Sequence, residues 1–150
     1  MNRPNIIWIF ADQMRAHAMS CAGDSNVNTP NLDALARRGT RFVNACSNYP
    51  VCVPARFTLL TGQRASSRWV PAIHWRMSPV ERTVAHELSS VGYATSYIGK
   101  WHLYGGDEPA NTYRRIPIPR THQGGFDRWQ GFEYRNDPFD SYYFVDDDTQ

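Results

Sequence analysis

The stretch from Val51 to Gly62, Val-Cys-Val-Pro-Ala-Arg-Phe-Thr-Leu-Leu-Thr-Gly, constrains this chain more than any other part of the sequence. Pro54 suits the first helical position, where no N–H is needed, and Gly62 suits the position just after a helix end. A short helix is therefore predicted over residues 54–61. Arg56 follows Cys52 by four positions, so both side chains lie on one side of the first turn, beside N–H groups that attract anions. The pattern predicts an anion site, although a buried apolar cysteine with a solvated arginine would explain these residues alone.

A continuous apolar run, Asn5–Ala11, lies between Pro4 and Asp12. Such a run is typical of a strand buried on both faces of a parallel sheet. Asp12 and Gln13 then follow at the carboxyl end of the predicted strand, where open α/β sheets bind ligands. Two oxygen-bearing side chains there suit a hard cation, and an aspartate that only caps the next turn is the alternative.

The following segments alternate between helix and strand patterns. The sequence predicts a helix over 30–38, a strand over 40–45, a helix that starts with a Ser78–Glu81 capping box and closes at Gly92, and a strand over 94–98. This alternation predicts an α/β fold with a mostly parallel sheet sandwiched by helices. Right-handed connections would bring Lys100 and His102 to the carboxyl edge as well, close to Asp12, although each alone could be a merely exposed residue.

From Tyr104 onward, prolines and glycines predict long loops. Only about three strands are recognisable, which is too few to build a fully covered parallel sheet. The predicted sheet is therefore incomplete, and residues 1–150 are interpreted as the amino-terminal part of a larger catalytic domain.

Composition excludes several classes of protein. The chain is 41% apolar with a formal charge of +2, and its basic residues are scattered, so no nucleic-acid surface is expected. Cys21, Cys46 and Cys52 are an odd set without paired spacing, which argues against a disulfide framework or a structural zinc site. The apolar runs are too short for a membrane span or a signal peptide, so the protein is expected to be cytoplasmic unless an export signal has been removed.

Four motifs in the same order resemble the formylglycine-dependent, cysteine-type sulfatases. They are the Cys52-x-Pro-x-Arg56 core with its Leu60-Thr-Gly62 continuation, Thr29-Pro-Asn-Leu-Asp-x-Leu-Ala36 with Gly39, Gly99-Lys-Trp-His-Leu103, and Gly125-Phe-Asp-x-x-x-Gly-Phe132. Their spread over most of the chain makes the resemblance far more specific than any one motif. It implies an alkaline-phosphatase-like fold and a sulfuric ester hydrolase.

The resemblance also implies a cofactor and a set of roles. A maturase would oxidise Cys52 to formylglycine, whose hydrate attacks a sulfate monoester. Arg56 would orient the hydrate, Lys100 would bind the sulfate, and His102 would hydrogen-bond the hydrate and act as a base. Asp12, Gln13 and the residue derived from Cys52 would bind Ca²⁺, with Mg²⁺ or Mn²⁺ as alternatives. Gln13 departs from the commoner second aspartate and brings no charge to that site.

Two other functions remain open at this point. A phosphonate monoester or phosphodiester hydrolase of the same superfamily can share the Asp-Gln pair, and a catalytically inert fragment would need no activity at all. The sulfated substrate, a small molecule or a glycan, is not specified, and neither is the oligomeric state. Trp69, His74, Trp75 and the loop after Gly105 are candidates for the substrate pocket.

Overall fold

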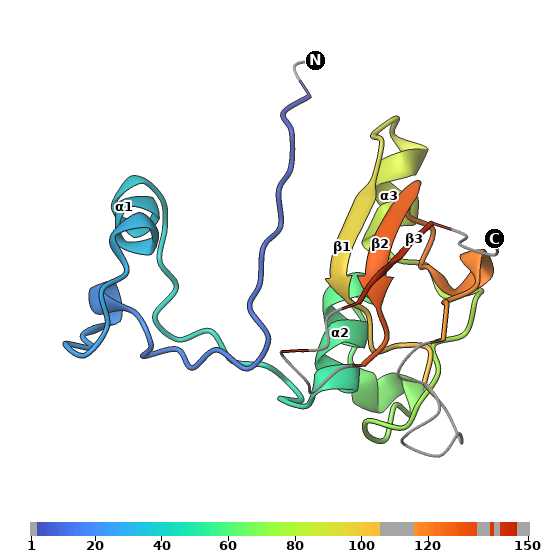
Figure 1. Ribbon diagram of the computed structural model, residues 1–150, viewed down its shortest axis with the longest axis horizontal. Helices are drawn as coiled ribbons and strands as arrows, with labels where there is room; N and C mark the ends of the chain where they lie inside the picture. The colour runs from blue at the N-terminus through green and yellow to red at the C-terminus, as the bar shows by residue number, and fades with distance from the viewer. Residues whose placement is uncertain (1–2, 106–115, 135–138, 140–141, 147–150) are drawn as a thin grey trace. The chain divides into compact units, whose positions relative to one another are not determined.

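The structure is a computed structural model that describes residues 3–105, 116–134, 139 and 142–146 (Figure 1). The chain divides into two compact units, residues 1–46 and residues 47–150. None of the helices in the described ranges has the length and apolar character that a membrane span requires.

The first unit contains the helix that was predicted over residues 30–38. Helix α1 covers Pro30–Arg38, and the short 3-10 helix η1, Ser20–Ala22, precedes it. The Asp33 carboxylate joins the two, because it accepts hydrogen bonds from Ser20 Oγ at 2.7 Å and from Thr29 Oγ1 at 3.0 Å. These hydroxyl groups lower the pKa of Asp33, the Ser20 bond being the larger cause. Thr29 therefore binds a side chain in the first turn rather than a free N–H of the helix.

Two strands predicted in the first unit are wrong. Neither residues 5–11 nor residues 40–45 form a strand, and Ile7 and Ile9 are 82% and 86% exposed. A strand needs a hydrogen-bonding partner beside it. In the part of the chain that the structure describes, the strands pair only with one another within residues 96–145, so the apolar run at 5–11 does not join the sheet.

Within its described residues, the second unit holds a mixed sheet and two α-helices. Its elements are α2 (Cys52–Thr61), η2 (Ala65–Arg68), α3 (Val84–Ser90), β1 (Ser96–Lys100), η4 (Arg120–His122), β2 (Arg128–Phe132) and β3 (Phe144–Val145). Strand β1 pairs in parallel with β2, and β2 pairs antiparallel with β3. The predicted strand over 94–98 is confirmed with a shift of two residues. Strands β2 and β3 were not predicted, because the glycines around them indicated loops; residues 106–115 of that predicted loop region lie outside the described residues.

Helix α2 confirms the helix predicted over residues 54–61, but it starts two residues earlier. It begins at Cys52, so Pro54 is the third helical residue rather than the first. A proline at the third helical position loses no intrahelical hydrogen bond, because the first four N–H groups of a helix lack intrahelical partners. Gly62 ends the helix in the left-handed conformation at φ 69°, as predicted.

Helix α3 starts later than predicted, although its end near Gly92 is confirmed. Thr83 is the N-cap: its hydroxyl accepts a hydrogen bond in the first turn, and His86 Nδ1 accepts from the Thr83 N–H at 3.1 Å. The predicted capping box at Ser78 fails because its acidic member, Glu81, pairs with Arg68 instead. Ser78 forms a turn, with its carbonyl accepting from the Glu81 N–H at 3.1 Å.

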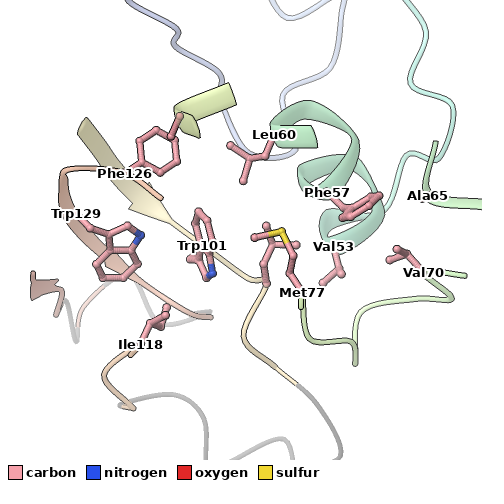
Figure 2. Close-up of a cluster of buried hydrophobic side chains, with 12 residues drawn as sticks. Val53, Phe57, Leu60, Ala65, Val70, Met77, Trp101, Ile118, Phe126 and Trp129 are labelled. Atoms are coloured by element: carbon pink, nitrogen blue, oxygen red, sulfur yellow. The ribbon is translucent and has the colours of Figure 1, made fainter. Parts of the chain in front are cut away.

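One cluster of buried apolar side chains holds α2 against the sheet. Figure 2 shows members of the cluster lying between α2 and the strands. The buried members are Val53, Phe57, Leu60, Ala65, Val70, Met77, Ala85, Trp101, Leu103, Ile118, Phe126 and Trp129. Because α2 contributes three of them and the strand region contributes both tryptophans, the start of α2 is fixed relative to the end of β1.

Candidate active site

Cys52 and Lys100 come together where β1 ends and α2 begins. Figure 1 shows β1 pointing toward α2 with its carboxyl end. Lys100 is the last residue of β1, and its Nζ lies 3.9 Å from Cys52 Sγ. Both residues are half-buried. Two of the residues predicted to share a site are therefore in contact, although 48 positions separate them in the sequence.

Arg56 joins α2 to the end of β1. It lies one turn after Cys52, is only 5% exposed, and donates from Nη1 to the Lys100 carbonyl at 2.5 Å. The Tyr97 hydroxyl donates to the same carbonyl oxygen. This arrangement holds Lys100 by its backbone carbonyl and places its ammonium group beside residue 52.

His102 lies just beyond β1 in an unusual backbone conformation. It is 3% exposed and has φ 53°, in the left-handed region that a non-glycine residue rarely adopts. Its ring centroid is 4.9 Å from that of Tyr134, and the same Tyr134 ring lies 5.5 Å from Lys100 Nζ. Tyr134 is thus a site residue that sequence reasoning missed, and no local pattern around it indicates such a role.

The electrostatics of this cluster favour an anion. The Lys100 ammonium and the Arg56 guanidinium lie close to the first turn of α2, whose unpaired N–H groups carry partial positive charge. A sulfate or phosphate group beside residue 52 would meet charge-assisted donors there.

Asp12 and Gln13 belong to the first unit and are exposed. Their oxygen atoms fit a hard divalent cation in kind. They would supply only part of a ligand set, since Ca²⁺ takes about six to eight oxygen ligands. Over the ranges that the structure describes, no three His, Cys, Asp or Glu side chains are grouped to hold a metal ion. Their role as metal ligands stays a prediction.

The residues proposed for the substrate pocket are only partly placed. Trp69 is 87% exposed and His74 is exposed, so both are accessible. Trp75 is half-buried and packs edge-on against Phe57 at 5.4 Å, which makes it part of the core packing. The loop after Gly105 lies outside the described residues.

The fold and this cluster define an α/β protein in which a lysine and an arginine lie beside a cysteine at the start of a helix. The sulfatase family profile matches residues 4–149, and the chain belongs to the sulfatase family. It is 38% identical to an ulvan-active sulfatase of Formosa agariphila over 99% of this chain and 28% of that protein. It is also 38% identical to human arylsulfatase A over 89% of this chain and 26% of the relative. The chain thus spans about a quarter of the length of these relatives.

Solved structures agree with this assignment. A sulfatase structure from Bacteroides fragilis matches with a TM-score of 0.84 at 33% identity, covering 96% of this chain and 34% of that one. A second structure, solved with its substrate D-glucosamine-2-N,6-O-disulfate, matches with a TM-score of 0.71 at 32% identity, covering 86% of this chain and 23% of that one. The predicted alkaline-phosphatase-like α/β fold class is confirmed. Sulfatases generally use a formylglycine and a divalent metal, and the names of the relatives do not favour the phosphonate hydrolase alternative.

Proposed function

We propose that the protein carrying this chain is a sulfuric ester hydrolase that cleaves a sulfate monoester with a nucleophile derived from Cys52. The observation that carries the proposal is the 3.9 Å contact between Lys100 Nζ and Cys52 Sγ in a chain of the sulfatase family. A cation in that position is placed to bind the anionic group that a nucleophile at residue 52 attacks.

Residue 52 would supply the covalent chemistry after oxidation of the cysteine by a formylglycine-generating maturase. That aldehyde, when hydrated, would supply two hydroxyls on one carbon, one as the nucleophile toward sulfur and one whose proton must be removed for sulfate to be released. Lys100 would bind the sulfate oxygens as charge develops on them. His102, two residues after Lys100 in the sequence, would hydrogen-bond the hydroxyls and accept the proton whose removal releases sulfate.

Arg56 has two roles in this proposal. Its position one turn after residue 52 allows the guanidinium to orient the hydroxyls through charge-assisted hydrogen bonds. Its bond to the Lys100 carbonyl also keeps the end of β1 against α2. A lysine at position 56 could not make both contacts, because it lacks the planar fork of donors.

Asp12 and Gln13 are proposed as ligands of the family's divalent metal, Ca²⁺ first, with Mg²⁺ or Mn²⁺ as alternatives. A carboxylate and an amide oxygen are suitable donors, and the neutral Gln13 makes the site weaker than one with two aspartates. When bound, the metal would neutralise charge on the sulfate.

The proposed substrate class is a sulfated glycan or smaller sulfate ester. One relative is named an ulvan-active sulfatase, and another, 35% identical, is an N-acetylgalactosamine-6-O-sulfatase of Bacteroides thetaiotaomicron that this chain matches over 83% of its own length and 25% of the relative's. The structural match solved with a glucosamine disulfate points the same way.

The test combines mass spectrometry of the tryptic peptide that contains residue 52 with turnover of a nitrophenyl sulfate by the full-length protein, co-expressed with a maturase. We expect the formylglycine mass and measurable turnover, and we expect Cys52→Ala to abolish turnover. Cys46→Ala is the matched control, because Cys46 is an exposed free cysteine and should leave turnover unchanged. A peptide that contains only cysteine, an active Cys52→Ala variant, or a preference for a nitrophenyl phosphonate ester would each contradict the proposal.

A further inference from the structure

A buried carboxylate, that of Glu133, binds the backbone of the segment that follows His102. Glu133 follows the last residue of β2 and is 1% exposed. Its Oε1 accepts hydrogen bonds from the N–H groups of Tyr104 at 2.9 Å and Gly105 at 2.5 Å, and its Oε2 accepts from the Leu103 N–H at 3.2 Å. Three consecutive backbone donors therefore converge on one side chain.

These contacts hold the chain on the far side of His102. On the near side, the Trp101 N–H donates to the Phe132 carbonyl at 2.7 Å and extends the pairing of β1 with β2 by one residue. His102 is then the point where the chain leaves the sheet, with its left-handed φ of 53°. A strained backbone of this kind persists only where the surroundings over-determine it. Two acceptors supply that constraint: the Phe132 carbonyl holds the residue before His102, and the Glu133 carboxylate holds the residues after it.

The residue after Glu133 contacts the side chains of the same site. The Tyr134 ring packs against His102 and lies 5.5 Å from Lys100 Nζ. Glu133 and Tyr134 thus contact the site in two ways: Glu133 binds the backbone that follows His102, and the Tyr134 ring lies against the side chains of His102 and Lys100. An apolar residue in place of Glu133 would leave the three backbone N–H groups of this buried segment without their acceptor, which is costly.

We propose that Glu133 is a positioning residue of the active site, which sets the backbone of residues 102–105 and thereby the place of the His102 imidazole relative to residue 52. The inference rests on the proposed sulfatase function for the reaction in which His102 takes part. Glu133 itself does not touch the substrate, because its carboxylate is fully engaged with backbone N–H groups of the buried segment.

The test is Glu133→Gln in the full-length, matured protein, with Glu81→Gln as the matched control. Glutamine has the same shape, but its amide nitrogen cannot accept a hydrogen bond, so at least one of the three N–H groups loses its partner. Glu81 is likewise buried, at 8% exposed, but binds Arg68 and Gln63 instead. We expect Glu133→Gln to lower kcat about 10- to 100-fold, as for residues that orient a catalytic group, with KM within about twofold.

Amide hydrogen exchange separates this inference from the proposed function. Leu103, Tyr104 and Gly105 should exchange as slowly as β1 in the unmutated protein and faster in Glu133→Gln. Unprotected amides there, an unchanged kcat in Glu133→Gln, or an equal loss of kcat in Glu81→Gln would each overturn the positioning role. If the unmutated protein hydrolyses no sulfate ester, the proposed function fails, and the exchange rates still decide whether Glu133 holds this segment.

Discussion

At the scale of single residues, Glu133 shows that one carboxylate can cost stability where it helps to shape a site. Burial raises the pKa of Glu133 from its ordinary 4.5 to about 7, against the opposing effects of the backbone N–H groups of Gly105, Tyr104 and Leu103 and of the Arg76 charge. The folded state therefore binds a proton that the unfolded chain has already released between these pH values. Stability must fall as the pH rises through this window.

The pH dependence of unfolding tests this directly. The favourable contribution of protonated Glu133 is complete below pH 4.5 and is lost as the pH approaches about 7, an effect on the order of 3 kcal/mol. In Glu133→Gln, residue 133 should contribute no pH dependence to the unfolding free energy over this range, because the amide does not titrate. Urea unfolding of both proteins from pH 4.5 to pH 8 gives the difference curve, in which groups common to both cancel. A difference that does not change with pH would show that Glu133 has an ordinary pKa.

At the scale of secondary structure elements, β1 and β2 approach closely at a pair of glycines. Gly99 and Gly131 are opposite each other in the parallel register. A Cβ atom on Gly131 would lie 2.5 Å from the Gly99 carbonyl oxygen and 2.8 Å from the Trp129 ring. The first neighbour is backbone and cannot rotate away, so the glycine is required for the pairing that places Lys100 beside α2.

Gly131→Ala should therefore separate the two strands. We expect a loss of unfolding free energy of about 1–3 kcal/mol, the usual range for overpacking a buried position. Gln130→Ala is the control on the same strand, since Gln130 is exposed and its substitution should change stability by less than about 0.5 kcal/mol. Equal midpoints of urea unfolding for Gly131→Ala and the unmutated chain would refute the close approach of β1 and β2.

At the scale of the whole molecule, buried apolar packing is confined to one of the two units. All twelve described core residues lie between Val53 and Trp129, whereas Ile6, Ile7 and Ile9 in the first unit are 59–86% exposed. Local stability follows buried contacts and protected hydrogen bonds. The two units should therefore differ strongly in how often their backbone amides open.

Amide hydrogen exchange on this 150-residue chain should show that difference. Residues 5–11 are expected to exchange close to the unprotected rate, because the strands of the described residues pair only with one another. Amides in β1 and in the middle of α2 should exchange orders of magnitude more slowly. Protection over 5–11 that equals the protection of β1 would mean that these residues do form a strand.

Local chemistry allowed a good part of this architecture to be predicted. Gly62 determines the end of α2 because a left-handed residue is needed there, and Pro30 with Thr29 indicates the start of α1. The start of α3 was predicted wrongly at Ser78, because the glutamate that would complete its capping box binds an arginine from another segment. Strand β2 was missed because the glycines that allow its close packing are locally identical to glycines of loops.

The sequence by itself determined the family and the identities of Cys52, Arg56, Lys100 and His102 as candidates, because those residues are recognised by type and spacing within short motifs. Only the tertiary structure decided that Lys100 reaches Cys52, that Arg56 binds the Lys100 carbonyl, and that Glu133 holds the segment after His102. The physical reason is that these contacts join residues about 30 to 48 positions apart. Their geometry depends on how α2 packs against the sheet, and no local pattern encodes that packing.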